Sequence, residues 1–116
     1  MKIGVVGARE GRTINEVFAV LKLFTKPGDI IVSGGAVGVD SFARQFAKEN
    51  GLEVKEYFPL QEKYPGQNPY HARNEDIVKD SEIIIAFPTY SPGTWNTINH
   101  AKRLNKRLII IKREKI

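Results

Sequence analysis

Short runs rich in Val and Ile alternate with segments of helical periodicity along the chain, and this alternation restricts the possible folds more than any other feature. Strands that alternate with helices form parallel sheets, because each helix returns the chain to the edge where the next strand begins. Strands of such a sheet are buried on both faces and are therefore continuously apolar. The predicted strands are residues 2–7, 29–33, 54–58, 82–87 and 107–112.

Helix boundaries can be predicted from short capping patterns. Thr13 and Glu16 have the spacing of a capping box at the start of the first helix, which ends before Lys26-Pro27-Gly28. Asn68-Pro69 predicts the start of a third helix that runs to about residue 79. The second helix carries Phe42, Ala43, Phe46 and Ala47 and ends at Asn50-Gly51, and the fourth spans about residues 95–105. The polar loop at 59–67 is expected to be mobile.

The order of the strands follows from general rules of topology. Parallel crossovers are right-handed and consecutive strands are usually neighbours, so we expect one α/β fold with a five-stranded parallel sheet in the order 3-2-1-4-5 and helices on both faces. The winding reverses between the first and fourth strands, which opens a crevice at the carboxyl edge of the sheet. A length of 116 residues predicts a single domain over 1–116.

Composition narrows the functional classes. The absence of cysteine excludes disulfides and thiol nucleophiles and favours a reducing compartment, so a cytoplasmic protein is expected. No targeting or membrane-spanning segment is evident, and two histidines without cysteines predict no metal site. The net charge of +5 favours an anionic partner, although a solvated helix face also accounts for much of it. The basic residues gather at Lys102, Arg103, Lys106, Arg107, Lys112, Arg113 and Lys115.

Glycine-rich turns follow the predicted strands, which places them together at the carboxyl edge, where open α/β sheets bind ligands. The richest turn is 33–40, and a second, 91–94, opens the helix after the fourth strand, across the crevice from residues 7–9. Glycine lets a backbone approach a ligand, and a helix start presents free N–H groups that suit phosphate. Tight packing also explains one such turn, but two that converge favour a binding site.

Several side chains near these turns have two interpretations. Arg9 pairs with a phosphate or carboxylate, or is simply an exposed turn arginine. Asp40 caps its helix or binds a ribose hydroxyl. Arg73 and Asn74 contact a phosphate or ribose, or form an exposed polar pair.

Tyr90 and Trp95 flank the 91–94 turn, where an aromatic ring can stack on a base, while core packing is an equal alternative for Trp95.

Taken in order, the patterns IGVVGAR, IVSGGAVGVDSFA, ARNEDIV, IIAF and PGTWNTINHA resemble the SLOG superfamily over nearly the whole chain. The chain is most similar to the small YspA-like SLOG proteins, with more distant similarity to DprA and the LOG phosphoribohydrolases. This resemblance implies a Rossmann-like domain that holds the phosphate and sugar of a nucleotide or nucleotide-derived ligand, without a further cofactor. The candidate ligand-binding residues are Gly7, Ala8, Arg9, Ser33, Gly34, Gly35, Ala36, Gly38, Asp40, Arg73, Asn74, Pro92, Gly93 and Thr94.

The chain departs from the LOG pattern at one important position. LOG enzymes have a glutamate in P-G-G-x-G-T-x-x-E that assists glycosidic cleavage, and Thr97 stands there in this chain. A binding or sensing module is therefore the first expectation. The alternatives are a LOG-like N-glycosidic hydrolase of nucleoside monophosphates, in which Asp40 or Glu75 replaces the missing carboxylate, and single-stranded nucleic-acid binding that resembles DprA. Catalytic residues are not assigned, and a homodimer is typical of the relatives.

Overall fold

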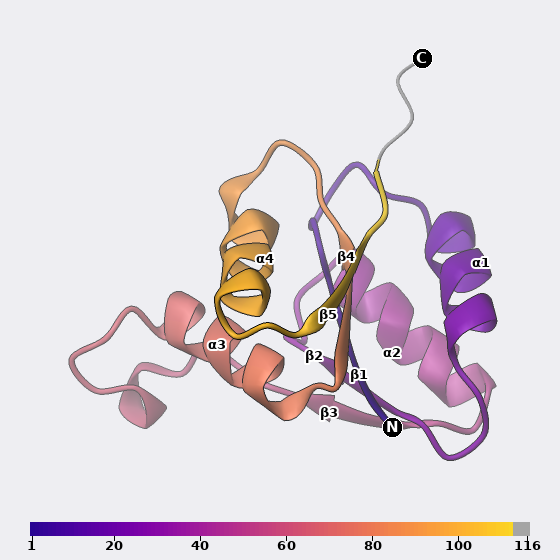
Figure 1. Cartoon of the computed structure of the whole chain (residues 1–116), viewed down its shortest axis with the longest axis horizontal. Coiled ribbons are helices and arrows are strands. Elements are labelled where there is room, and N and C mark those ends of the chain that lie inside the picture. Colours follow the sequence, from indigo (N-terminus) through magenta and orange to yellow (C-terminus); the bar gives the residue numbers. More distant parts are fainter. Residues whose placement is uncertain (113–116) are drawn as a thin grey trace.

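The computed structural model describes residues 1–112 and confirms the predicted α/β fold (Figure 1). Strands and helices alternate along the described chain, with one short 3-10 helix in the 59–67 loop. The strands are β1 (Lys2–Gly7), β2 (Ile30–Ser33), β3 (Glu53–Glu56), β4 (Ile83–Phe87) and β5 (Arg107–Ile110), and the helices are α1 (Ile14–Phe24), α2 (Val39–Glu49), the 3-10 helix η1 (Gln61–Lys63), α3 (Pro69–Asp80) and α4 (Pro92–Arg103).

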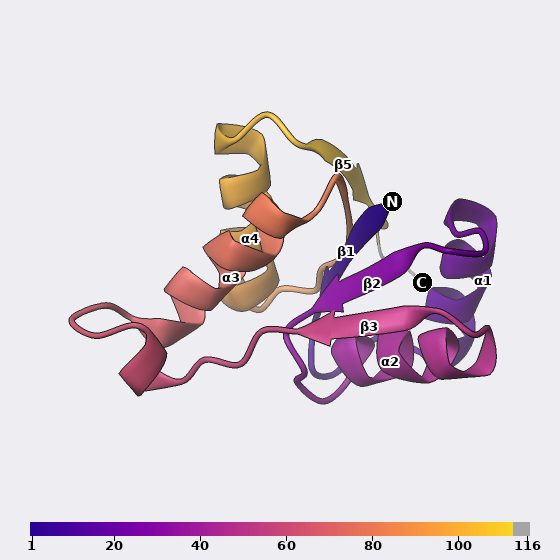
Figure 2. The same ribbon diagram turned by 90° about the horizontal axis from the view of Figure 1, so that it is seen from below.

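The five strands form one parallel sheet in the order β3-β2-β1-β4-β5, which confirms the predicted topology (Figure 2). The central strand β1 pairs with β2 through Gly4 and Val32 and with β4 through Gly4 and Ile84. The winding reverses between these two neighbours of β1. The carboxyl ends of the strands therefore meet at one edge, beside the loops that lead into α1, α2 and α4.

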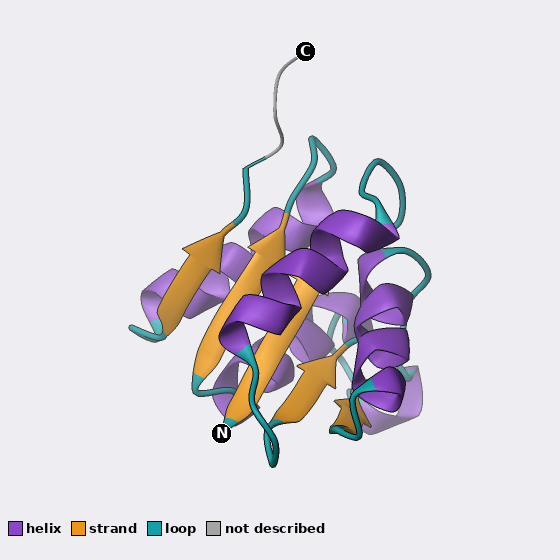
Figure 3. Cartoon of the chain, turned by 90° about the vertical axis from the view of Figure 1, so that its right-hand side faces the viewer, coloured by secondary structure: helices purple, strands orange, loops and turns teal. Residues whose placement is uncertain are grey.

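Helices cover both faces of the sheet, so its strands are buried on both sides (Figures 1 and 3). Alternate residues of each strand point to opposite faces. Ile3 and Val5 of β1 pack toward α1 and α2 around Leu21 and Phe46. On the opposite face, Val6 packs with residues of β4, α3 and α4, including Ile77, Val78, Ile84 and Ile98.

Local capping patterns determine where the helices begin. The capping box of α1 is present, since Thr13 Oγ1 accepts from the Glu16 amide and Glu16 Oε2 accepts from the Thr13 amide. Helix α4 begins at Pro92, three residues before the predicted start. Ser91 is extended and Pro92 occupies the first helical position, where its missing N–H costs nothing.

The 59–67 loop contains η1 and is anchored to α3. The buried Tyr64 donates its hydroxyl proton to Asp76 at 2.6 Å, and Gln61 Nε2 donates to the carbonyls of Tyr64 and Gln67. Among residues 1–112, no helix has the length and apolar character needed to cross a membrane. Arg113 and Lys115, which belong to the basic group noted in the sequence, lie outside the described residues.

Candidate functional site

A cleft of about 1120 Å³ opens at the carboxyl edge of the sheet, at the point where the winding reverses. One wall is formed by the loops after β1 and β2, and the other by α3, the loop after β4 and the first turns of α4. The predicted residues that line it are Gly7, Ala8, Arg9, Gly34, Ala36, Asp40, Arg73, Asn74, Pro92, Gly93 and Thr94. Three other predicted residues, Ser33, Gly35 and Gly38, are not part of the lining.

The glycines of the 33–40 turn make room for groups of the protein itself. Gly38 has a φ of +81°, and a Cβ there would lie 2.5 Å from the Ala8 and Arg9 carbonyl oxygens. A Cβ at Gly35 would meet the Phe58 ring. These glycines allow the loops after β1 and β2 to pack closely, and so they position the first wall of the cleft.

Asp40 is the second residue of α2, so the prediction that it caps this helix is wrong. Gly38 occupies the N-cap position, because its positive φ is needed to turn the chain into the helix. The buried Asp40 carboxylate instead accepts a hydrogen bond from the Ala36 amide at 3.2 Å. Burial raises its pKa to about 6, against the lowering influence of the Ala36 amide and the Arg73 guanidinium.

Arg73 and Asn74 are buried, so the alternative of an exposed polar pair is wrong. Arg73 Nη1 donates to the carbonyls of Gly34 at 2.8 Å and Tyr57 at 3.1 Å, which fixes the end of β2 against α3. Arg73 Nε donates to Asn74 Oδ1, and Asn74 Nδ2 donates to Asn96 Oδ1 on α4, both at 3.0 Å. A chain of polar contacts therefore crosses the floor of the cleft.

The N-terminus of α4 presents unused donors to the cleft. The Ser91 side chain makes no capping hydrogen bond, and the amides of Gly93 and Thr94 are in the first turn, where an α-helix offers no internal acceptor. Gly93 is exposed, and a Cβ added there would meet no atom within 4 Å. Together with the exposed Arg9, which also lines the cleft, this helix end favours an anion.

The N-terminus of α2 is less suited to an anion. Its first amide, Val39 N–H, already donates to the Ala8 carbonyl at 3.1 Å. The Asp40 carboxyl group also lies beside this end and disfavours a second negative charge when it is ionised. The two glycine-rich turns therefore differ in chemistry, although the sequence suggested the same role for both.

Aromatic side chains stand at the rim of the cleft. Tyr90 is 92% exposed, Tyr70 49% and Trp95 40%. Trp95 is therefore not a core residue, and its Nε1 donates to the Thr89 carbonyl at 2.8 Å. The Tyr70 ring lies 5.9 Å from the Arg73 guanidinium carbon. Sequence reasoning missed Tyr70, and it also missed Asn96 and Asn99, whose spacing of three places them on one face of α4.

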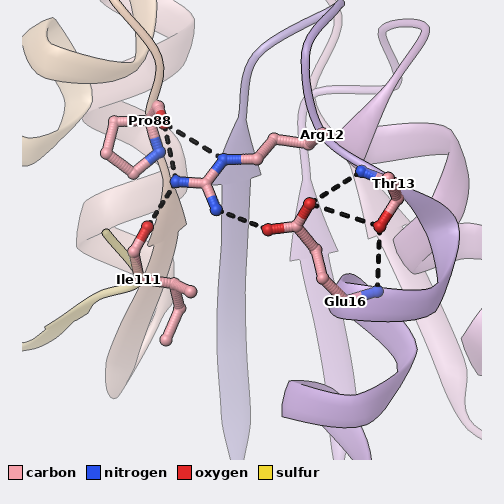
Figure 4. A network of polar contacts seen from close by, with 5 residues as sticks. All are labelled: Arg12, Thr13, Glu16, Pro88 and Ile111. Carbon is pink, nitrogen blue, oxygen red and sulfur yellow. Dashed lines mark hydrogen bonds and ion pairs between the residues drawn. The ribbon is translucent and has the colours of Figure 1, made fainter. Parts of the chain in front are cut away.

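Arg12, another residue that the sequence did not reveal, connects the loops beside the cleft (Figure 4). It is buried, and its Nε and Nη2 donate to the Pro88 carbonyl at 3.1 and 2.7 Å. Nη2 also donates to the Ile111 carbonyl, and Nη1 pairs with Glu16 at 2.6 Å. The guanidinium therefore joins the loop after β1 to the ends of β4 and β5.

Within residues 1–112, no group of three potential metal-ligating side chains comes together. The polar lining of the cleft consists instead of amides, hydroxyls, two arginines, the His71 imidazole and the carboxyl groups of Asp40 and Glu10. This set of groups can hold an anionic, hydrogen-bonding organic ligand without a metal.

The match of a family model to residues 1–74 places the chain in the SLOG superfamily, and the parallel sheet and its strand order agree with the Rossmann-like fold of that superfamily. More particularly, the chain belongs to the DNA recombination-mediator protein A family, whose model matches residues 1–74. No curated protein matches the chain significantly in sequence.

Solved structures share the fold at low sequence identity. DNA processing protein A from Streptococcus pneumoniae superposes with a TM-score of 0.83 and 20% identity over 99% of this chain. The chain spans 51% of that protein's length. The molybdenum cofactor binding protein of Rippkaea orientalis superposes with a TM-score of 0.79 and 24% sequence identity, over 97% of this chain and 77% of that chain. The Moco carrier protein of Chlamydomonas reinhardtii superposes with a TM-score of 0.60 and 20% sequence identity. The superposition covers 95% of this chain and 75% of that chain.

Proposed function

We propose that the cleft binds a nucleotide or nucleotide-derived anion and that the chain acts as a binding or sensing module. The observation that carries this proposal is the open N-terminus of α4, whose Gly93 and Thr94 amides share the cleft with Arg9. Backbone amides at a helix start and a guanidinium fork are suited to phosphate. The polar floor of the cleft around Asp40 and Arg73 suits the sugar of such a ligand, which is uncharged and lies between the phosphate and the base.

The rim aromatics support a nucleotide rather than a simple phosphate. Tyr70, Tyr90 and Trp95 are exposed to solvent where they line the cleft, and an aromatic face of this kind stacks on a planar heterocycle. The volume of about 1120 Å³ exceeds the roughly 300 Å³ at the lower end of small-molecule pockets. There is room for a base as well as for phosphate and sugar.

N-glycosidic hydrolysis is a second candidate, favoured by one observation. Asp40 lines the cleft with its pKa raised to about 6, which suits proton transfer near neutral pH. Thr97, at the position of the LOG glutamate, is buried and has no acidic group. Glu75 is outside the lining and pairs with Lys79 and Arg103. Release of free base from nucleoside monophosphates, lost in Asp40→Asn, would establish this candidate, and no release above a buffer blank would reject it.

Family membership supports a nucleic acid as an alternative ligand of the protein. A cytoplasmic location and a homodimer also stay predictions, and light scattering after size-exclusion chromatography tests the dimer.

The first experiment for the main proposal is a thermal-shift screen with nucleotides, dinucleotides, cyclic nucleotides and ADP-ribose derivatives. A ligand at 100 times its Kd stabilises the fold by about 2.7 kcal/mol, which is readily measured. Arg9→Ala is expected to weaken binding of a hit by about tenfold, because a charge-assisted hydrogen bond is worth about 1.5 kcal/mol or more.

Arg44→Ala is the matched control, since Arg44 is exposed on α2 and pairs only with Glu56 among the described side chains. Unchanged affinity in Arg9→Ala would refute the position of the phosphate. A screen in which no nucleotide shifts the melting temperature would refute the proposal as a whole.

A further inference from the structure

Asp40 and Arg73 have hydrogen-bonding capacity that residues 1–112 do not use. On the Asp40 carboxylate, Oδ2 accepts from the Ala36 amide at 3.2 Å, and the Gly34 amide also lowers the pKa of this carboxyl through a backbone hydrogen bond. Arg73 uses Nε and Nη1, and no hydrogen bond within the described chain involves its Nη2. The buried side-chain atoms without a partner in this part of the chain are Ser33 Oγ and His100 Nε2, so Asp40 Oδ1 and Arg73 Nη2 are not sealed off. Both residues line the cleft.

The two side chains flank one point beside Gly34. A Cβ on Gly34 would lie 2.7 Å from Arg73 Nη1 and 2.9 Å from Asp40 Oδ2. No ion pair within 4.0 Å joins Asp40 and Arg73, whereas several pairs elsewhere among residues 1–112 meet that distance. An acceptor and a donor therefore stand side by side on the floor of the cleft without satisfying each other.

This arrangement is selective for a particular kind of group. A phosphate or carboxylate is disfavoured by Asp40, and an ammonium group by Arg73. A hydroxyl carries one donor and two acceptor sites, so of two hydroxyls on neighbouring carbons one donates to the carboxylate while the other accepts from the guanidinium. An uncharged vicinal diol matches both open atoms at once.

We propose that Asp40 and Arg73 form a subsite for the vicinal diol of a ribose, so that the ligand is a ribonucleotide rather than a 2′-deoxyribonucleotide. This inference rests on the proposed function, because the phosphate at α4 and Arg9 brings the sugar over the floor of the cleft. A site that hydrogen-bonds a hydroxyl rejects the analogue that lacks it, since its own buried groups are then left unpaired. The cleft thereby discriminates against DNA-derived ligands.

The test is a calorimetric titration of the unaltered protein with the 5′-monophosphates of adenosine, guanosine and cytidine and with their 2′-deoxy counterparts. The expected result is at least about tenfold weaker binding of each deoxy analogue, from the loss of one charge-assisted hydrogen bond. Equal or tighter binding of the deoxy analogues would overturn the diol subsite while leaving the proposed function in place. If none of the six compounds binds, the proposed function fails and the subsite with it.

Two variants assign the discrimination to its residues. Asp40→Asn keeps an acceptor for the Ala36 amide but removes the carboxylate. The logarithm of the Kd ratio between deoxy and ribo ligands is therefore expected to fall to half or less. Glu53→Gln removes an exposed carboxylate that lies outside the lining of the cleft and is expected to keep the full preference. A preference that survives in Asp40→Asn would overturn the assignment. Because the comparison of ribo and deoxy ligands needs no variant, the inference stays testable even if Asp40→Asn does not fold.

Discussion

Among single residues, Gly38 shows most clearly how the loops of the cleft are held. Gly38→Ala is expected to lower the free energy of unfolding by about 2 kcal/mol or more, since φ is +81° and the new methyl group would meet two backbone oxygens at 2.5 Å. Gly51→Ala is the matched control, because φ is +67° there but nothing lies within 4 Å. It is expected to cost only about 1 kcal/mol. Urea unfolding of both variants measures the difference, and equal losses would contradict the role of Gly38.

Asp40 makes a distinct contribution to the pH dependence of stability. Its folded-state pKa of about 6 exceeds the unfolded value of 3.8, so between these values the folded state binds the extra proton. The contribution of Asp40 to stability therefore falls as pH rises from about 4 to 6. Burial is the main cause of the raised pKa; the charge of Glu56 raises it further, and the charge of Arg73 lowers it.

Relative to the unaltered protein, Asp40→Asn is expected to gain stability as the pH increases across this window and to level off above it. Glu16→Gln is the opposite case, because the pKa of Glu16 is lowered. Partial burial raises this pKa, but the hydrogen bonds with Thr13 and Arg12 lower it by more. That variant should lose relative stability as pH rises through the acid range. Parallel stability curves for Asp40→Asn and the unaltered protein would show that the Asp40 pKa is not raised.

At the level of elements, Arg12 connects the loop before α1 with the ends of β4 and β5. Arg12→Ala is expected to destabilise the fold by about 3 kcal/mol, because it leaves the Pro88 carbonyl without its buried donor and separates Glu16 from its partner. Arg44→Ala removes an exposed arginine that has one carboxylate partner and is expected to cost less than about 1 kcal/mol. Chemical denaturation compares them, and a loss at Arg12 no larger than at Arg44 would contradict the connecting role.

The elements also show what the sequence could and could not predict. The strands and the α1 capping box were predictable because periodicity and capping act over a few neighbouring residues, and the strand order followed from the handedness of parallel crossovers. The Arg12 contacts were not, since Pro88 and Ile111 are 76 and 99 residues away along the chain. In the site, the sequence identified Asp40 and Arg73 as candidates, but only the packing around Gly34 shows that they are buried together.

For the whole molecule, the salt dependence of binding separates a nucleotide cleft from a nucleic-acid surface. A nucleotide with one or two phosphates at Arg9 and α4 is expected to lose less than about tenfold in affinity between 50 and 200 mM salt, because few counterions are released. A single-stranded oligonucleotide held along a basic face should lose orders of magnitude. Titrations with a nucleotide and with a labelled single strand measure both slopes. Strong, steeply salt-dependent strand binding without any nucleotide binding would favour the nucleic-acid alternative.

The family match covers the two walls of the cleft unequally. The family match ends at Asn74 within α3, so it includes the loops after β1 and β2 together with Asp40 and Arg73, while α4 and the loop before it lie beyond the match. Substitutions at residues 89–99 would therefore change the second wall without touching any residue that the family model matches. A match to this family model describes the first wall of the cleft, and the chemistry of the ligand that the second wall accepts has to be measured for each protein.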